Sequence, residues 1–349
     1  MPTISVIIPI YNVESYIQQC LESVLAQTFQ NIEILCVNDC GTDNSMQIVK
    51  KYAQKDNRIK IVDLEINKGL GAARNAGLKI AGGKYIACID SDDYVEPDMF
   101  KLSCNKLEET GFDSVWVNMK IFDDNKQYFL KDNYLSKHSE GIINITSENI
   151  NHFPVNAWNK LYNLDFVKAH NVLWSDGLFY EDMEFYYRFY TKSKTLYFID
   201  QPLYIYRVRD NSILHNDKTG KSNKREDIFK VAKNIYIYLN EEKIFEKYKN
   251  SFIEMIIQSI ERSHNTEAIT PAVINLLKTI NFPSNFEKND CYDFLEYFIK
   301  YSKSSNLKKF FYKCYYIFVL FLTKIIPNAK YRRKYRSKYK PYVFKTLRR

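Results

Sequence analysis

The sequence predicts an α/β fold, a Rossmann-like and mostly parallel sheet flanked by helices, followed by a C-terminal helical region. Two patterns support this prediction. Over roughly the first third of the chain, short runs rich in Ile and Val alternate with amphipathic stretches, which is the rhythm of strands and helices around a parallel sheet. From Glu226 onward, apolar residues such as Ile228, Val231 and Ile235 recur at helical spacing. A chain of 349 residues, 46% of them apolar, is long enough to build both parts.

Each strand is expected where a short apolar run ends in turn residues, and each helix where an apolar face repeats every three or four residues. The expected strands are 5–10, 32–37, 59–64, 85–90 and 114–119. The expected helices are 13–26, 43–54, 71–81 and 97–109. Ligands gather beyond the carboxyl ends of strands in such sheets, so the polar residues after the first, second and fourth strands form one candidate site.

The cysteines and the N-terminus indicate the compartment. Seven cysteines are scattered without a CxxC pair, and several stand inside apolar runs, as reduced core thiols do. The first residues contain no basic segment followed by an apolar one, as a signal peptide would. We therefore expect a cytoplasmic protein.

The positive charge is concentrated at the C-terminal end. The formal net charge is +9, and residues 330–349 hold ten Lys or Arg and no acidic residue. The preceding segment, 310–326, is rich in aromatic and aliphatic residues, but its lysines leave too short an uncharged stretch to span a bilayer. We expect 307–349 to be an amphipathic tail that binds an anionic membrane surface rather than nucleic acid. The alternative is a helix packed on the main domain with a solvated basic face.

The turn Asp90-Ser91-Asp92-Asp93 follows the fourth expected strand. Its alternate carboxylates can converge on a small volume, and hard oxygen ligands suit Mn²⁺ or Mg²⁺. A divalent ion would neutralise the charge that develops on a diphosphate leaving group. The alternative is a surface turn that caps the helix beginning near Pro97.

A glycine-containing segment, 67–77, follows the third expected strand and carries Arg74. Its glycines permit close backbone approach, and a helix N-terminus beside an arginine is a favourable phosphate environment. The alternative is that the glycines serve turns and that Arg74 forms an internal ion pair.

Four motifs in the N-terminal third together resemble family 2 glycosyltransferases with the GT-A fold: 8–14, 37–45, 67–77 and 90–93. The resemblance implies that Pro9, Tyr11 and Asp39 hold uracil and ribose. It also implies that Asp90 lies beside the ribose. The full set of nucleotide-sugar-binding residues expected is Pro9, Tyr11, Glu14, Asp39, Asn67, Arg74, Asp90 and Ser91.

The same resemblance implies that Arg74 approaches the diphosphate and that Asp92 binds the metal. His215 is a further candidate that could complete the metal or diphosphate site, and the alternative is a loop histidine in solvent. The sequence departs from the family pattern at one motif. Where the family has Asp-Asp-Gly-Ser, this chain has Asn38-Asp39-Cys40-Gly41, so a charge-dependent contact at position 38 is in doubt.

Inversion at an anomeric carbon requires one base within hydrogen-bond reach of the acceptor hydroxyl. Glu181-Asp182 precedes a helical pattern and resembles the family's acidic pair, which makes Asp182 the expected base. Glu181 would orient the acceptor or pack at the start of the helix, and the alternative is that both carboxylates only cap that helix. The segment Trp158-Asn159-Lys160 resembles one common in bacterial members that build surface polysaccharides, and we expect these three residues to meet the sugars, with a core position for Trp158 as the alternative.

The sequence thus predicts an inverting, Mn²⁺- or Mg²⁺-dependent hexosyltransferase that uses a UDP-sugar donor. The acceptor would be a glycan or lipid-linked glycan of bacterial capsule or lipopolysaccharide, and the enzyme would be peripheral on the inner face of the plasma membrane. The expected parts are a GT-A domain (1–220, nucleotide-sugar half 1–120 and acceptor half 121–220), a helical region (221–306) and the tail (307–349). The alternatives are a sugar nucleotidyltransferase and a non-catalytic glycan-binding protein of the same fold.

Overall fold

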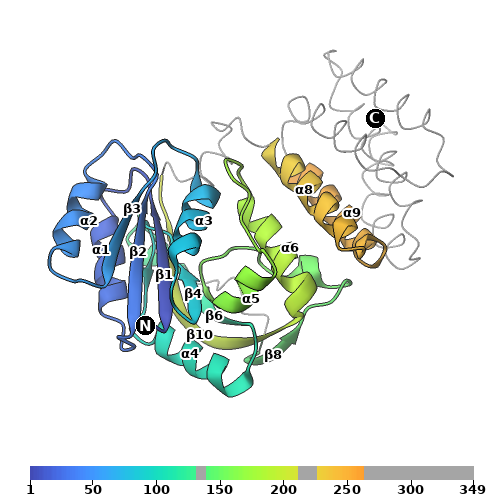
Figure 1. The fold of residues 1–349 in the computed structure, drawn as a ribbon, viewed down its shortest axis with the longest axis horizontal. Helices are drawn as coiled ribbons and strands as arrows, with labels where there is room; N and C mark the ends of the chain where they lie inside the picture. Colours follow the sequence, from blue (N-terminus) through green and yellow to red (C-terminus); the bar gives the residue numbers. More distant parts are fainter. Residues whose placement is uncertain (131–138, 211–225, 263–349) are drawn as a thin grey trace, which may run out of the picture. The chain divides into compact units, whose positions relative to one another are not determined.

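The computed structural model describes residues 1–130, 139–210 and 226–262 (Figure 1). Contacts divide the chain into two compact units. One unit comprises 1–146 with 152–224, and the other comprises 147–151 with 225–349. The expected domain boundary after residue 220, His215 and the C-terminal tail all lie outside the described residues.

The first unit is built on one sheet with the strand order β3-β2-β1-β4-β9-β6-β10-β5. Two short strands extend it, since β7 pairs with β6 and β8 pairs with β10. The strands are β1 (Ile4–Ile10), β2 (Ile32–Asn38), β3 (Ile59–Asp63), β4 (Tyr85–Cys88), β5 (Tyr94–Val95), β6 (Ser114–Asp123), β7 (Tyr128–Phe129), β8 (Gly141–Asn144), β9 (Lys160–Asn163) and β10 (Thr195–Val208).

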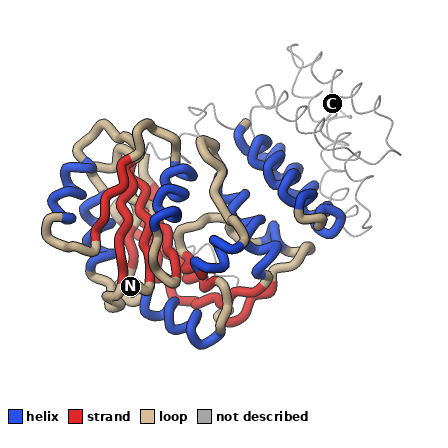
Figure 2. Tube along the Cα trace, in the orientation of Figure 1, coloured by secondary structure: helices blue, strands red, loops and turns tan. Residues whose placement is uncertain are grey.

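The helices of this unit are α1 (Ile17–Leu25), α2 (Ser45–Ala53), α3 (Leu70–Ile80), α4 (Met99–Thr110), α5 (Leu164–Ala169) and α6 (Glu181–Ser193). Figures 1 and 2 show α1 and α2 on one side of the first strands and α3 on the other. Coverage on both faces explains why every residue of β1 is buried and why its sequence is a continuous apolar run.

The strands β3, β2, β1 and β4 run parallel, which confirms the expected mostly parallel α/β core. α1 presents an apolar stripe, Ile17, Cys20, Leu21 and Val24, to this core. α3 begins after Gly69, whose φ of +85° is a conformation that L side chains rarely adopt. That glycine ends the loop after β3 and lets the chain enter the helix.

The second half of the sheet is mixed, and the sequence did not predict β9 or β10. β9 lies antiparallel between β4 and β6, and β10 runs parallel to β6. β10 shifts register between Ile199 and Tyr204, where Asp200, Gln201 and Pro202 interrupt the apolar pattern. The bulge therefore hides a 14-residue strand from a search for strict alternation.

The second unit contains α8 (Asp227–Glu241) and α9 (Phe245–Arg262) within the described residues. Buried residues of α8, including Ile228, Val231 and Ile235, follow the spacing seen in the sequence. A 3₁₀ turn spans Ile150–His152, and Asn151 Nδ2 donates to the carbonyl of Ser251 on α9. Among the described helices, none is long and apolar enough to cross a membrane.

Candidate active site

The carboxyl ends of β1, β2 and β4 meet at one edge of the sheet, as their parallel register requires. Asp39, directly after β2, is nearly buried, and its two carboxylate oxygens accept hydrogen bonds from the backbone N–H groups of Lys68 and Gly69 (2.7 and 2.9 Å). Asn67 Nδ2 donates to the carbonyl of Asp39. Asp39 therefore holds the loop before α3 against the end of β2.

The other donor-side residues expected from the sequence differ in exposure. Tyr11 and Asn67 are exposed at this edge, whereas Pro9 lies buried within β1 and Ser91 is buried. The carboxylate of Glu14 accepts from the backbone N–H and from the side-chain amide of Asn44 (3.1 and 2.9 Å). Glu14 thus joins the starts of α1 and α2.

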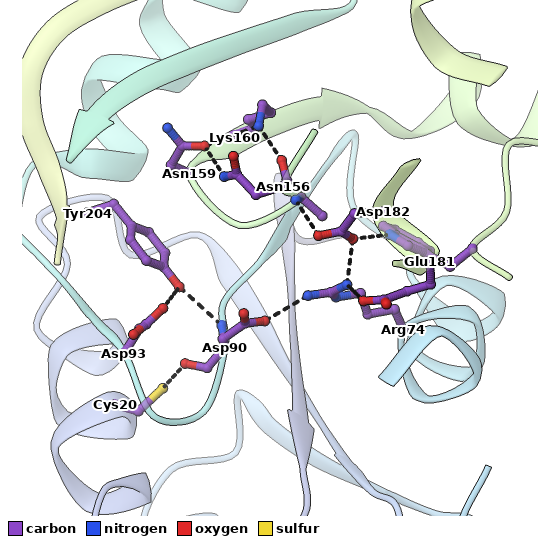
Figure 3. A network of polar contacts seen from close by, with 12 residues as sticks. Cys20, Arg74, Asp90, Asp93, Asn156, Asn159, Lys160, Glu181, Asp182 and Tyr204 are labelled. Carbon is purple, nitrogen blue, oxygen red and sulfur yellow. Dashed lines mark hydrogen bonds and ion pairs between the residues drawn. The ribbon is translucent and has the colours of Figure 1, made fainter. Parts of the chain in front are cut away.

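Arg74, on α3, is the centre of a buried ionic cluster that connects the end of β4 with the start of α6 (Figure 3). Its guanidinium donates from Nη2 to Asp90 (2.8 Å) and from Nη1 to Glu181 (2.8 Å) and Asp182 (2.6 Å). Asp90 follows β4, whereas the other two carboxylates begin α6. Arg74 therefore takes the internal ion-pair arrangement that the sequence left open, and its side chain is 1% exposed.

Three carboxylates share this one guanidinium, so the cluster holds more acid than base. Burial, together with the charge of Asp182, raises the pKa of Glu181 from 4.5 to about 8. Burial raises the pKa of Asp90 to about 6, against the opposing effect of Arg74. At neutral pH Glu181 therefore keeps its proton, which relieves the repulsion among the three acids.

Hydrogen bonds hold both oxygens of Asp182. Its Oδ1 accepts from Arg74 and from Trp174 Nε1 (3.1 Å), while its Oδ2 accepts from the backbone N–H of Ala157 (3.1 Å). Oδ2 therefore retains capacity for a further hydrogen bond. Tyr180, just before the pair, has a φ of +66°, a strained conformation of the kind found at functional sites.

The acidic turn after β4 divides into two roles. Asp93 is buried and accepts from the hydroxyl of Tyr204 and the backbone N–H of Arg207, both at 2.8 Å, so it attaches the turn to β10. Asp92 is partly exposed and its Oδ2 pairs with Arg209 at 2.8 Å. Asp92 is thus the more accessible of the two carboxylates.

Comparisons with known proteins identify the family of this chain. The profile described as Glycosyl transferase family 2 matches residues 5–169. EpsH of Bacillus subtilis, named as a glycosyltransferase, is 33% identical over 296 residues, which cover 71% of this chain and 82% of EpsH. This chain belongs to glycosyltransferase family 2. The chondroitin synthase of Pasteurella multocida is 40% identical over 102 residues, 29% of this chain and 10% of that enzyme.

The crystal structure of S. aureus TarS 1–349 in complex with UDP-GlcNAc has a TM-score of 0.65 with this glycosyltransferase. The two are 24% identical, and the match covers 80% of this chain and 81% of that one. The likeness confirms the expected GT-A fold.

The acceptor-side segment of the glycosyltransferase is placed differently from the sequence expectation. Trp158 is half-buried and stacks on Tyr204 and Tyr206, with ring centroids 4.6 and 5.3 Å away, which matches its alternative as a core anchor. Asn159 and Lys160 are buried, 1% and 0% exposed, and bond to groups of the protein itself. Burial removes these two side chains from direct contact with a sugar in this structure.

Three site residues were not singled out from the sequence: Trp174, Arg207 and Arg209. Arg207 and Arg209 are two residues apart at the end of β10, a spacing that places both on one face toward the acidic turn. The two-residue spacing of the arginines can be read from the sequence, but the sequence did not predict strand β10, which places them on one face. Trp174 carried no sequence signal, since its bond to Asp182 depends on the loop before α6.

Proposed function

We propose that this glycosyltransferase moves a hexose or N-acetylhexosamine from a UDP-sugar to a glycan acceptor with inversion, in the synthesis of a bacterial capsule or lipopolysaccharide. The observation that supports this most is the position of Asp182. It stands at the start of α6, yet Arg74 joins it directly to Asp90 at the end of a donor-side strand. A candidate base and the donor-binding edge therefore share one rigid cluster.

The proposed base role of Asp182 follows from its hydrogen bonds. Oδ1 is occupied by Arg74 and Trp174, so Oδ2 is the atom that can accept the proton of an acceptor hydroxyl. A single carboxylate on the face opposite the leaving diphosphate produces inversion in one displacement. Glu181, which keeps its proton at neutral pH, would donate a hydrogen bond rather than compete as a base.

The donor class is supported by the relatives. TarS has been crystallised with UDP-GlcNAc, and a chondroitin synthase shares 40% identity over 102 residues. In this chain, the exposed Tyr11 and Asn67 flank Asp39 at the edge where the nucleotide would lie. These residues would bind uracil and ribose.

The residues present fit a divalent cation in part. Among the described residues, no group of three His, Cys, Asp or Glu side chains could hold a metal alone. Asp92 is a partly exposed hard oxygen donor, and the remaining ligands would come from the diphosphate and from His215, which lies outside the described residues. Bound Mn²⁺ or Mg²⁺ would neutralise the charge of the departing UDP.

Release of UDP from a panel of UDP-sugars with Mn²⁺ tests the proposal. We expect turnover of at least one donor, its loss with EDTA, and a product anomer inverted by ¹H NMR. Asp92→Asn should lower the affinity for Mn²⁺, measured by UDP-dependent thermal shift, with Asp165→Asn at an exposed position on α5 as control. No turnover of any donor, or a product of retained configuration, contradicts the proposal.

We also propose that the tail 307–349 holds the enzyme on the inner face of the plasma membrane, on the strength of its basic and aromatic sequence. A chain ending at residue 306 should leave the membrane fraction of lysed cells. Membrane association unchanged by that truncation contradicts the proposal.

A further inference from the structure

Lys160 is a buried cation whose contacts lead to Asp182. It is the first residue of β9, is 0% exposed, and lies with Nζ 4.6 Å from the ring centroid of Trp116. Its Nζ donates to the backbone carbonyl of Asn156 and to Oδ1 of Asn159, the latter at 3.2 Å. The lysine therefore closes the turn that precedes its own strand.

The carbonyl of Asn156 and the N–H of Ala157 belong to the same peptide group. Lys160 holds the carbonyl, and the N–H at the other end donates to Oδ2 of Asp182 (3.1 Å) (Figure 3). The two groups of a trans peptide point in opposite directions, so fixing the carbonyl toward the lysine aims the N–H at the carboxylate. A positive charge at the carbonyl also polarises the peptide and strengthens its N–H as a donor.

The rest of the turn is built to hold this peptide in place. Asn159 Oδ1 also accepts from the side-chain amide of Asn156 (2.7 Å), and Asn159 Nδ2 donates to the carbonyl of Val117 on β6 (2.6 Å). Val117 returns a backbone hydrogen bond to the carbonyl of Asn159 (3.0 Å). The sheet thus fixes Asn159, and Asn159 and Lys160 together fix the peptide.

We propose that Lys160 is a positioning residue that orients and tunes Asp182 through the peptide group joining Asn156 and Ala157. The inference rests on the proposed role of Asp182 as the base. Lys160 acts through this peptide rather than on the substrate. Lys160 fixes the direction of the N–H that donates to Oδ2 of Asp182. It thereby fixes which lone pair of Oδ2 stays free to accept a proton.

Other charged groups also face Asp182. Arg74, Glu181 and Asp90 approach it from α3, α6 and the end of β4. Burial lowers the pKa of Lys160 to about 7, while the charge of Asp182 opposes that lowering. The lysine therefore changes charge near neutral pH, within the range where the enzyme would work.

Lys160→Met removes the charge and keeps an apolar side chain of similar length. We expect kcat at pH 7 to fall about tenfold, with KM for the UDP-sugar changed less than about twofold. We also expect the acidic limb of the pH–rate profile to move up by about 0.5 to 1 pH unit, because the base loses a favourable charge. An equal loss at every pH, with no movement of the limb, overturns the inference, since a merely structural role predicts that result.

Lys168→Met is the matched control. Lys168 Nζ also donates to a backbone carbonyl, that of Ala81 (2.9 Å), but the residue is exposed on α5 and this bond leads away from Asp182. We expect this variant to keep the wild-type pH–rate profile. A limb that moves as far in the control as in Lys160→Met overturns the inference.

An NMR titration of the wild-type chain tests the inference without an activity assay and without a variant. The amide ¹⁵N and ¹H resonances of Ala157 should follow the titration of Lys160, with a midpoint near pH 7. An Ala157 amide that does not respond while Lys160 itself titrates overturns the inference, whereas absence of turnover in the wild-type enzyme would instead count against the proposed function.

Discussion

Two buried arginines form hydrogen bonds to the acidic turn after β4, and their other partners differ. Arg74 is paired with three carboxylates, one after β4 and two at the start of α6. Arg207 donates from Nε to the carbonyl of Asp92 (2.8 Å), and its guanidinium also pairs with Asp124 and Gln19. Its backbone N–H donates to Asp93.

The side chains around the two guanidinium groups also differ. The guanidinium of Arg207 lies 5.1 to 5.6 Å from the ring centroids of Tyr16, Tyr94 and Phe122, so three aromatic rings surround it. The Arg74 cluster has excess acid, and burial raises the pKa of two of the carboxyl groups that its guanidinium contacts. Burial also raises the pKa of Asp93, but Arg207 contacts Asp93 through its backbone N–H and not through its guanidinium. The guanidinium of Arg207 thus pairs with one carboxylate, whereas that of Arg74 pairs with three carboxyl groups, two of which have raised pKa values. Carboxyl groups with raised pKa values are typical of active sites.

Arg74→Met should show the largest effect. It leaves three carboxylates without a cation and should lower the free energy of unfolding by about 3 to 5 kcal/mol. The loss should be greater at pH 8 than at pH 5.5, because the carboxylates protonate at the lower pH. Urea denaturation at both values measures it.

Arg207→Met provides the comparison. Its partners are mostly neutral, so the loss of stability should be nearly the same at pH 5.5 and pH 8. If the loss of stability depends on pH equally in Arg74→Met and Arg207→Met, the proposed difference between the two arginines is wrong.

Gly71→Ala should show the next largest effect, because at Gly71 helix α3 contacts the loop before α6. A Cβ at Gly71 would lie 2.2 Å from the carbonyl oxygen of Ser175 and 3.2 Å from Cβ of Glu181. We expect a loss of about 1 to 3 kcal/mol of stability together with a loss of turnover, since Asp182 must shift. Gly77→Ala, which meets the side chain of Ile7 instead, should lower stability and leave kcat within about twofold. Equal kcat in the two variants would contradict this account.

Glu181→Gln tests whether Glu181 is protonated at neutral pH in the folded protein. The folded-state pKa of Glu181 is raised, so the native state binds more protons than the unfolded state between pH 4.5 and about 8. Its contribution to stability is therefore present below pH 4.5 and is lost as pH rises toward 8. The glutamine variant should remove this loss, on the order of 1 kcal/mol per pH unit at most, and flatten the dependence of Tm on pH. A variant whose Tm still falls as steeply as that of the wild type rules out Glu181 as the proton carrier.

Trp174→Phe should show the smallest effect. It removes the Nε1–H donor to Asp182 and keeps an aromatic ring stacked on Phe185, whose centroid is 3.9 Å away. Stability should fall by about 1 kcal/mol. Because Arg74 still holds Oδ1 and the Ala157 N–H still holds Oδ2, we expect kcat to fall only a few-fold; no change in kcat would show that the Trp174 bond does not help to orient the carboxylate.

The sequence predicted the parts of the site that depend on local pattern. Buried parallel strands end in polar residues, so the pattern alone assigns Asp39 and Asp90 to one edge of the sheet. Arg74 could not be resolved between phosphate and ion pair, because its partners Glu181 and Asp182 lie more than 100 residues away along the chain.

The acceptor side was less predictable for a physical reason. Asn159 and Lys160 are polar in sequence, and only the pairing of β9 with β4 and β6 shows that they are buried. The bulge in β10 likewise concealed the strand that places Arg207 and Arg209 beside the acidic turn. Polar residues buried by long-range pairing carry no periodic signal of their own.

Turnover by Asp182→Asn tests the central claim most directly. The asparagine keeps an oxygen for Arg74 and Trp174 but loses the acceptor for the Ala157 N–H, so stability should fall by about 1 to 3 kcal/mol. The binding of UDP with Mn²⁺ should stay within about twofold of wild type by calorimetry. Removal of a general base should reduce kcat by about 10² to 10⁴. A variant that binds UDP normally and keeps turnover within about threefold of the wild type would show that Asp182 is not the base.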